Sequence, residues 1–351
     1  MENKLTLWFM QFLIVGVSLN LKEQLVSAEP KFPCYFIFGD SLVDNGNNNN
    51  LNTTAKVNYL PYGIDFPQGP TGRFTNGRNI ADFIGELLGF ENYIPPFANS
   101  RNQDVFTGVN YGSGAAGILD ESGYQVGAVI SLNKQLSNHR VVISRIATLL
   151  GGEKVAKEYL NKCIYTVAMG NNDYLNNYYL PQYYSSSSLY TPDQFAARLI
   201  RQYSKQLRKL YKYGARKVAV FALGQLGCCP AEAALYGSSD SSCVESINNA
   251  AKIFNDKLKQ LLDHLNYLLA DANFIYTNTA TDSYGNITVL SGSCCALSDI
   301  GQCLPEAVTC NNRDEYMFWD GFHPTEAGNL LSAKKAYNEM SPLFTNLIDV
   351  E

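Results

Sequence analysis

Phe36-Ile37-Phe38-Gly39-Asp40-Ser41-Leu42 is an apolar run of strand length that stops at a glycine, an acid and a hydroxyl. Such a run is typical of a central strand in a parallel sheet, and ligands of these sheets collect at the carboxyl ends of the strands. Ser41 is therefore a candidate nucleophile. Alone the pattern is weak, because a serine in this setting usually serves as a turn residue or helix cap.

Strand and helix patterns alternate after residue 33, as expected for an α/β fold with a parallel sheet. Strand character occurs at residues 34–38, 106–111, 163–169, 217–222 and 273–277. Helical spacing occurs at 80–88, 127–150, 191–213, 243–270 and after Pro324. We expect a three-layer α/β/α sandwich around five strands, forming a single domain over residues 29–351.

Composition narrows the class of protein. The chain has 351 residues, of which 46% are hydrophobic and 17% charged, so it can bury a substantial core. A net charge of -5, a pI near 5.4 and the lack of long lysine or arginine runs argue against binding to nucleic acid.

Residues 1–28 resemble a secretory signal peptide. Lys4 precedes an apolar stretch from Leu5 to Val17, and small residues end the segment at Ala28, the expected cleavage point. A membrane anchor is the alternative, but the apolar stretch is short for a span of about 20 residues and contains Gln11. No later segment is long and apolar enough to span a membrane. We expect a soluble, secreted, extracellular protein.

The nine cysteines suit an oxidising compartment. Six of them lie in loop-like sequence and favour disulfides: Cys228, Cys243, Cys294, Cys295, Cys303 and Cys310. Zinc is the alternative, but the Cys-x-x-Cys spacing is missing, so we expect no metal. Cys34 and Cys163 lie in apolar strand-like runs, which predicts buried thiols. Because the total is odd, at least one cysteine is free or pairs between chains.

Three loop-like features of the sequence predict exposed or binding segments. Asn52 and Asn286 begin N-glycosylation acceptor sequences, which predicts two exposed loops. The asparagine run at 45–50 predicts a solvated loop after Ser41. The tyrosine-rich segment 174–190 either flanks a binding cleft or is a surface loop packed by its own aromatic rings.

A serine hydroxyl needs a base to become a nucleophile. Of three histidines, His139 and His264 lie on helical stretches and are expected to be surface or packing residues. His323 follows Asp320 by three residues in a turn that ends at a proline. This spacing lets the Asp320 carboxylate reach Nδ1 and leaves Nε2 to face Ser41, although a histidine that merely caps a turn is the alternative.

Acyl transfer also needs donors for the oxyanion. Residues 170–173, Gly-Asn-Asn-Asp, follow a predicted strand, and residues 112–117, Gly-Ser-Gly-Ala-Ala-Gly, follow another. One such donor lowers the barrier by roughly 3 to 4 kcal/mol. A plain polar turn is the alternative for each stretch. The second also matches G-x-G-x-x-G, but the acid expected about 20 residues later in dinucleotide sites is missing, so we expect no cofactor.

Four blocks in order resemble the plant GDSL esterase/lipases of the SGNH hydrolase superfamily, and the resemblance covers the whole mature chain. The blocks are residues 39–47, 110–118, 170–173 and 318–326. The resemblance implies a flavodoxin-like sheet of five parallel strands. This sequence departs from the pattern at Gly112, where alanine is usual, at Ala115, where a second glycine is common, and in a shortened stretch between Asp282 and Cys294.

Carried over block by block, the resemblance assigns each role to one residue. Ser41 becomes the nucleophile and first oxyanion donor, Gly114 the second donor and Asn172 the third. His323 becomes the base, with Asp320 as its partner. The resemblance also implies a Cys228–Cys243 disulfide and two pairs among the four later cysteines, with Cys229 as an extra thiol.

These observations predict a secreted carboxylic-ester hydrolase that works through an acyl-enzyme. An acyltransferase that uses the same intermediate is one alternative, and a catalytically silent extracellular binding protein is another. The substrate is expected to be a small-molecule, lipid or carbohydrate ester, and the sequence does not choose among these or indicate an oligomeric state.

Overall fold

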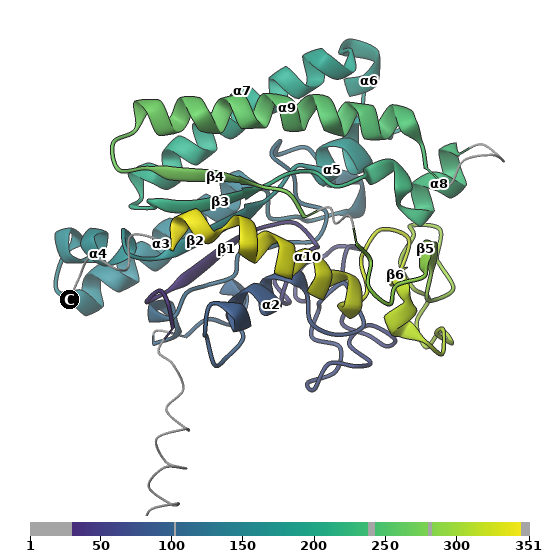
Figure 1. Cartoon of the computed structure of the whole chain (residues 1–351), viewed down its shortest axis with the longest axis horizontal. Coiled ribbons are helices and arrows are strands. Elements are labelled where there is room, and N and C mark those ends of the chain that lie inside the picture. Colours follow the sequence, from purple (N-terminus) through teal and green to yellow (C-terminus); the bar gives the residue numbers. More distant parts are fainter. Residues whose placement is uncertain (1–29, 102, 238–242, 280–282, 345–351) are drawn as a thin grey trace, which may run out of the picture.

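The centre of the molecule is a parallel sheet of four strands in the order β1 (Tyr35–Gly39), β2 (Ile164–Ala168), β3 (Lys217–Phe221) and β4 (Asn273–Thr277) (Figure 1). The computed structural model describes residues 30–101, 103–237, 243–279 and 283–344. The predicted signal peptide lies outside these residues.

Helices cover both faces of this sheet, which confirms the predicted α/β sandwich (Figure 1). Phe36 and Phe38 of β1 point into one core, whereas Tyr35 and Ile37 point into the other, as the two-residue period of a strand requires. The first core is covered by α3 (Leu132–Leu150), α4 (Glu153–Leu160), α7 (Pro192–Lys212) and α9 (Glu245–Leu268). The second is covered by α2 (Ile80–Leu87) and α10 (Glu326–Glu339).

Shorter elements surround these layers. They are α5 (Asn171–Asp173), α6 (Ser186–Leu189), α8 (Pro230–Tyr236) and a two-stranded sheet of β5 (Val289–Ser293) and β6 (Tyr316–Phe318). Within the described part of the chain, no helix is long and apolar enough to cross a membrane.

The fifth predicted strand, 106–111, is only partly formed. It runs beside β1, where the Ile37 N–H donates to Val109 O (3.1 Å) and the Tyr111 N–H donates to Ile37 O (2.8 Å). Gly108 has φ +119°, which breaks the extended conformation, and a Cβ there would lie 1.9 Å from Tyr35 O. The segment still completes the flavodoxin-like spatial order, with 106–111 outside β1.

Two helix starts illustrate what local sequence determines. The predicted capping box at Thr191 and Gln194 is present and starts α7. The helix expected from residue 127 begins instead at Leu132, after Ser131 caps it. Gly127, at φ +102°, ends a preceding 3-10 turn and prevents an earlier start.

Cys34 and Cys163 form a disulfide, so the prediction of buried thiols is wrong. The cause is strand register. Tyr35 of β1 pairs with Ile164 of β2, and the residue before each strand is therefore opposite the other, with Cα atoms 4.8 Å apart. Two runs that are more than 100 residues apart in the sequence are neighbours in the sheet.

The disulfides implied by the resemblance are confirmed. Cys228 pairs with Cys243, and the later cysteines form Cys294–Cys310 and Cys295–Cys303. Cys229 is the free, buried thiol. The two glycosylation candidates, Asn52 and Asn286, are both exposed, and their modification stays a prediction.

Candidate active site

Ser41 lies in a tight turn at the carboxyl end of β1. The turn is held by Asp40, whose carboxylate accepts the Leu42 N–H (3.0 Å) and the side-chain amide of Asn171 (2.8 Å). Gly39 is required at the strand end, because a Cβ there would lie 2.7 Å from the carbonyl oxygen of Ala168. Ser41 itself remains partly exposed, so a substrate can reach its hydroxyl.

The structure brings three predicted side chains into one line of contacts. Ser41 Oγ lies 2.8 Å from His323 Nε2. His323 Nδ1 lies 2.8 Å from each carboxylate oxygen of Asp320. Asp320 is fully buried and also accepts the backbone N–H groups of Phe322 (2.9 Å) and His323 (2.8 Å). The turn that joins Asp320 to His323 thus fixes the carboxylate under the imidazole.

The imidazole is supported from the side as well. The ring of Phe74 packs against that of His323 with centroids 4.8 Å apart. Phe74 comes from the long loop between β1 and α2, which places it close to the C-terminal turn. This contact restricts the rotation of the imidazole and keeps Nε2 directed at Ser41.

The glycine-rich segment differs from the assignment made by resemblance. The Gly114 N–H donates to Asp44 Oδ2 at 3.0 Å, so it is already engaged. The next N–H, that of Ala115, has no acceptor among the described residues. Ala115 adopts φ +62°, a conformation that favours glycine.

Asn172 lies in α5, directly after the strand β2 and Gly170. Its side-chain Nδ2 donates to Ala116 O (3.0 Å), and its Oδ1 accepts from Asn176 Nδ2 (2.6 Å). These bonds fix which way the amide faces and leave one Nδ2 hydrogen for another acceptor. They also place the amide beside the glycine-rich segment.

Residues 45–48 of the asparagine run are buried and only Asn50 at its end is exposed, so the predicted solvated loop is wrong for most of the run. Asn47 donates to the carbonyls of Asn110 (3.0 Å) and Gly112 (2.7 Å). Asn48 donates to the carbonyls of Ala55 (2.7 Å) and Gly114 (3.1 Å). The physical reason is that a buried loop without regular secondary structure leaves carbonyls unpaired, and short amide side chains satisfy them.

Asp44 extends this buried network. Its carboxylate accepts the N–H groups of Gly46 (2.7 Å), Asn47 (2.7 Å) and Gly114 (3.0 Å). Burial raises its pKa to about 6, partly opposed by these donors. The sequence did not predict this role for Asp44, and the available signal was the group of polar residues at 44–48, a few positions after the strand end.

The tyrosine-rich segment is packed by its own rings and by those of neighbouring helices. Tyr174 and Tyr178 are buried, and Tyr178 packs on Phe195 with centroids 4.8 Å apart. Asn176 of the same segment connects Asn172 to the side chain of Gln125. The segment therefore supports Asn172, while its role as a cleft wall stays a prediction.

The remaining histidines do not join the site. His139 is buried with Nδ1 2.9 Å from the Tyr111 hydroxyl, and His264 is exposed, as the sequence predicts for packing and surface residues. Among the described residues, no group of three or more histidine, cysteine or acidic side chains is arranged to hold a metal ion. Two cavities, of about 330 and 430 Å³, are lined by neither Ser41 nor His323.

Comparison with known proteins identifies the family of the chain. Residues 35–336 match the family of GDSL-like lipases and acylhydrolases. The chain is similar to several GDSL esterase/lipases of Arabidopsis thaliana. One is 47% identical, with 96% of this chain and 95% of the relative covered. Another is 45% identical, with 97% of each covered. This chain belongs to the GDSL-like lipase/acylhydrolase family.

Proposed function

We propose that the protein hydrolyses carboxylic esters with Ser41 as nucleophile, His323 as general base and Asp320 as the partner of the base. The observation that carries this proposal is the unbroken line of contacts from Ser41 Oγ through the imidazole to the buried carboxylate. The names of its relatives, esterase and lipase, support the same reaction class.

The geometry accounts for each proton transfer. His323 Nε2 takes the Ser41 proton as Oγ attacks the ester carbonyl, and Asp320 stabilises the imidazolium that forms. His323 then gives that proton to the departing alcohol, which leaves an acyl group on Ser41. A water molecule, deprotonated by the same nitrogen, attacks the acyl-enzyme. His323 then returns this proton to Ser41 Oγ as the bond to the acyl group breaks and the acid is released.

Three donors are proposed for the oxyanion. The N–H of Ser41 and the side chain of Asn172 keep the roles that the resemblance implied. We move the second role from Gly114 to Ala115, because the Gly114 N–H is bonded to Asp44 whereas that of Ala115 has no acceptor in the described residues. A donor already bonded to a carboxylate would have to break that bond before it could stabilise a second negative charge.

Ser41→Ala tests the proposed nucleophile. The variant should lose turnover of p-nitrophenyl butyrate while its melting temperature stays within a few degrees of wild type, because the hydroxyl is partly exposed. A fluorophosphonate probe should label the wild-type protein and not the variant. Turnover by Ser41→Ala, or equal labelling of both proteins, would contradict the assignment.

Export is proposed on three supports. The first 28 residues have the composition of a signal peptide, the described residues contain four disulfides, and disulfides persist mainly in oxidising compartments.

N-terminal sequencing of the secreted protein should give a sequence that begins after Ala28. A mass loss on glycosidase treatment should disappear when Asn52 and Asn286 are both changed to glutamine, and an intact Met1 in secreted protein would contradict cleavage.

A further inference from the structure

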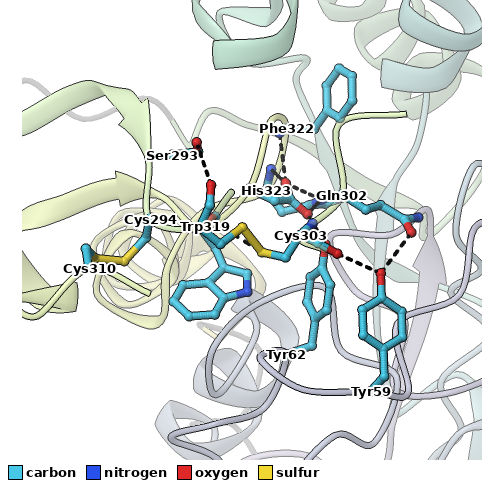
Figure 2. Close-up of a disulfide and its surroundings, with 12 residues drawn as sticks. Tyr59, Tyr62, Ser293, Cys294, Gln302, Cys303, Cys310, Trp319, Phe322 and His323 are labelled. Atoms are coloured by element: carbon cyan, nitrogen blue, oxygen red, sulfur yellow. Dashed lines mark hydrogen bonds and ion pairs between the residues drawn. A yellow bond between two sulfur atoms is a disulfide. The ribbon is translucent and has the colours of Figure 1, made fainter. Parts of the chain in front are cut away.

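Tyr62 is a buried residue whose hydroxyl contacts the acid of the proposed triad. The hydroxyl donates to Asp320 Oδ2 at 2.6 Å and accepts the N–H of Cys303 at 2.9 Å. Both Tyr62 and Asp320 are fully inaccessible to solvent. Figure 2 shows the Tyr62 ring directed from its loop toward Cys303 and the turn that carries His323.

This contact differs in origin from the other bonds to Asp320. The Phe322 and His323 N–H groups lie within three residues of Asp320 and both bind Oδ1. Tyr62 is 258 residues away in sequence and binds Oδ2. Among the described residues, Tyr62 is the one donor to this carboxylate that comes from another part of the chain. The backbone N–H groups of the turn do not bind Oδ2, so without Tyr62 this oxygen would contact only the imidazole of His323.

The direction of the Tyr62 hydroxyl proton is set by its surroundings. The Cys303 N–H occupies a lone pair of the phenol oxygen, so the O–H is left to point at Asp320. Burial, with the nearby charge of Asp320, holds the pKa of Tyr62 well above its usual range, so the phenol stays protonated. The phenol therefore acts as a donor to the Asp320 carboxylate.

The ring of Tyr62 is also held firmly. It packs edge-on against Tyr59 and Phe74, at centroid distances of 5.4 and 6.4 Å, in a core that contains Trp319. Cys303, which supplies the N–H, is bonded through its sulfur to Cys295. Ring and donor are thus both fixed before substrate arrives.

We propose that Tyr62 is a positioning residue for ester hydrolysis, which orients the Asp320 carboxylate and draws part of its charge away from the imidazole. This inference rests on the proposed function. A hydrogen bond from a neutral donor to a buried carboxylate is among the stronger bonds in proteins. It acts on the reaction only through Asp320, because Tyr62 contacts neither Ser41 nor His323 by a hydrogen bond.

Tyr62→Phe removes the hydroxyl and keeps the ring. We expect kcat for p-nitrophenyl butyrate to fall about 10- to 100-fold with little change in KM, since the loss concerns the base and not substrate binding. The acid limb of the pH profile should move to higher pH. Without Tyr62, Asp320 offers its full charge to the protonated imidazole and stabilises that inactive form.

Tyr59→Phe is the matched control. The Tyr59 hydroxyl donates to the carbonyl of the same Cys303 (3.0 Å) and lies in the same aromatic cluster, but it makes no bond to Asp320. Its kcat should stay within twofold of wild type and its pH profile should not move. Equal losses in Tyr59→Phe and Tyr62→Phe would overturn the proposal, because the effect would then belong to the cluster and not to the bond.

A double-mutant cycle separates positioning from a general structural effect. Asp320→Asn should be slow by itself, and adding Tyr62→Phe to it should cost less than twofold further. The same fold-loss in both backgrounds would overturn the proposal. Full activity in Asp320→Asn would instead contradict the proposed triad. The experiment therefore distinguishes failure of the proposed function from failure of the proposed role of Tyr62.

A second replacement covers the case in which Tyr62→Phe does not fold. Site-specific 3,5-difluorotyrosine at position 62 keeps the hydroxyl but makes it a stronger donor. It should move the acid limb to lower pH, opposite to the loss of the hydroxyl. Tyr59 and Cys229, whose pKa values burial raises, stay protonated in both proteins. An unmoved acid limb would overturn the inference.

Discussion

His139 is an imidazole enclosed by aromatic rings on the α3 side of the sheet. Phe36 and Phe38 lie 4.8 and 5.3 Å from it, measured between ring centroids. Its Nδ1 pairs with the Tyr111 hydroxyl, and its Nε2 has no partner among the described residues. Burial lowers its pKa from 6.5 to about 3, because the positive form would lose its hydration.

This residue makes folding sensitive to acid. Between pH 6.5 and 3 the unfolded chain binds a proton at His139 that the folded chain does not, so stability falls as pH drops below 6.5. His139→Gln keeps a polar partner for Tyr111 and cannot titrate. Between pH 7.5 and 4.5, wild type should lose about 2 to 3 kcal/mol more free energy of unfolding than His139→Gln, measured by urea denaturation.

His264→Gln provides the control for the acid effect. His264 is exposed on α9 and so lacks the burial that His139 has. The pH dependence of unfolding in this variant should therefore match wild type. If His139→Gln also matched wild type over the same range, His139 would have to be protonated in the folded state.

At single residues, the sequence predicted the proposed catalytic side chains better than the residues that support them. Ser41, Asp320 and His323 could be predicted because each follows a strand end or lies in a short turn whose reach is set by chain geometry. Tyr62 could not, since its contact with Asp320 spans 258 residues and depends on tertiary packing. The free N–H of the glycine-rich turn could not be predicted either, because it depends on where Asp44 binds.

At the scale of elements, the side chains of the asparagine segment 45–50 bind backbone carbonyls that would otherwise be paired within a regular sheet. Asn48 is buried, and its amide bonds the carbonyls of Ala55 and Gly114 while its oxygen accepts from Ser113 (2.6 Å). Asn48→Ala would leave three buried polar groups without these partners. We expect a loss of about 2 to 3 kcal/mol in unfolding free energy, measured by urea denaturation, and a kcat about 10- to 100-fold lower, because Ala115 would shift with Gly114.

Asn58→Ala is a matched control for this element. Asn58 is the same residue type on the following segment, but its side chain is exposed. Its replacement should change the unfolding free energy by less than about 0.5 kcal/mol and leave kcat unchanged. A stable, fully active Asn48→Ala protein would show that the asparagine segment does not position the glycine-rich turn.

The elements that the sequence predicted correctly are those with a local cause. Buried parallel strands are apolar runs, and the capping box of α7 is encoded within four residues. The prediction of a regular strand at 106–111 was only partly correct, because Gly108 lies against the backbone of Tyr35, which is close in space and distant in sequence. The burial of the asparagine run could not be predicted for the same reason, since the carbonyls that its side chains bind belong to other loops.

Across the whole molecule, two of the four disulfides of the described residues lie at opposite ends of the sheet. Cys34–Cys163 joins β1 and β2 at their amino ends, whereas Ser41 follows the carboxyl end of β1, a strand length of about 17 Å away. Cys295–Cys303 instead lies beside Tyr62, whose hydroxyl accepts the Cys303 N–H. We therefore expect the Cys34–Cys163 disulfide to contribute mainly to stability and the Cys295–Cys303 disulfide to contribute to the reaction.

Paired alanine variants test this division. Cys34→Ala with Cys163→Ala opens a loop of 129 residues, and should lower the unfolding free energy by up to about 5 kcal/mol in the chain-entropy account, with kcat within twofold of wild type. Cys295→Ala with Cys303→Ala opens a loop of eight residues, and should cost about half as much stability. Its kcat should nevertheless fall, because the donor that orients Tyr62 is no longer fixed. Guanidinium unfolding and p-nitrophenyl butyrate turnover, at a temperature where both variants are folded, measure the two effects. Equal kcat in the two variants would contradict a role for the Cys295–Cys303 bridge in holding Tyr62 against Asp320.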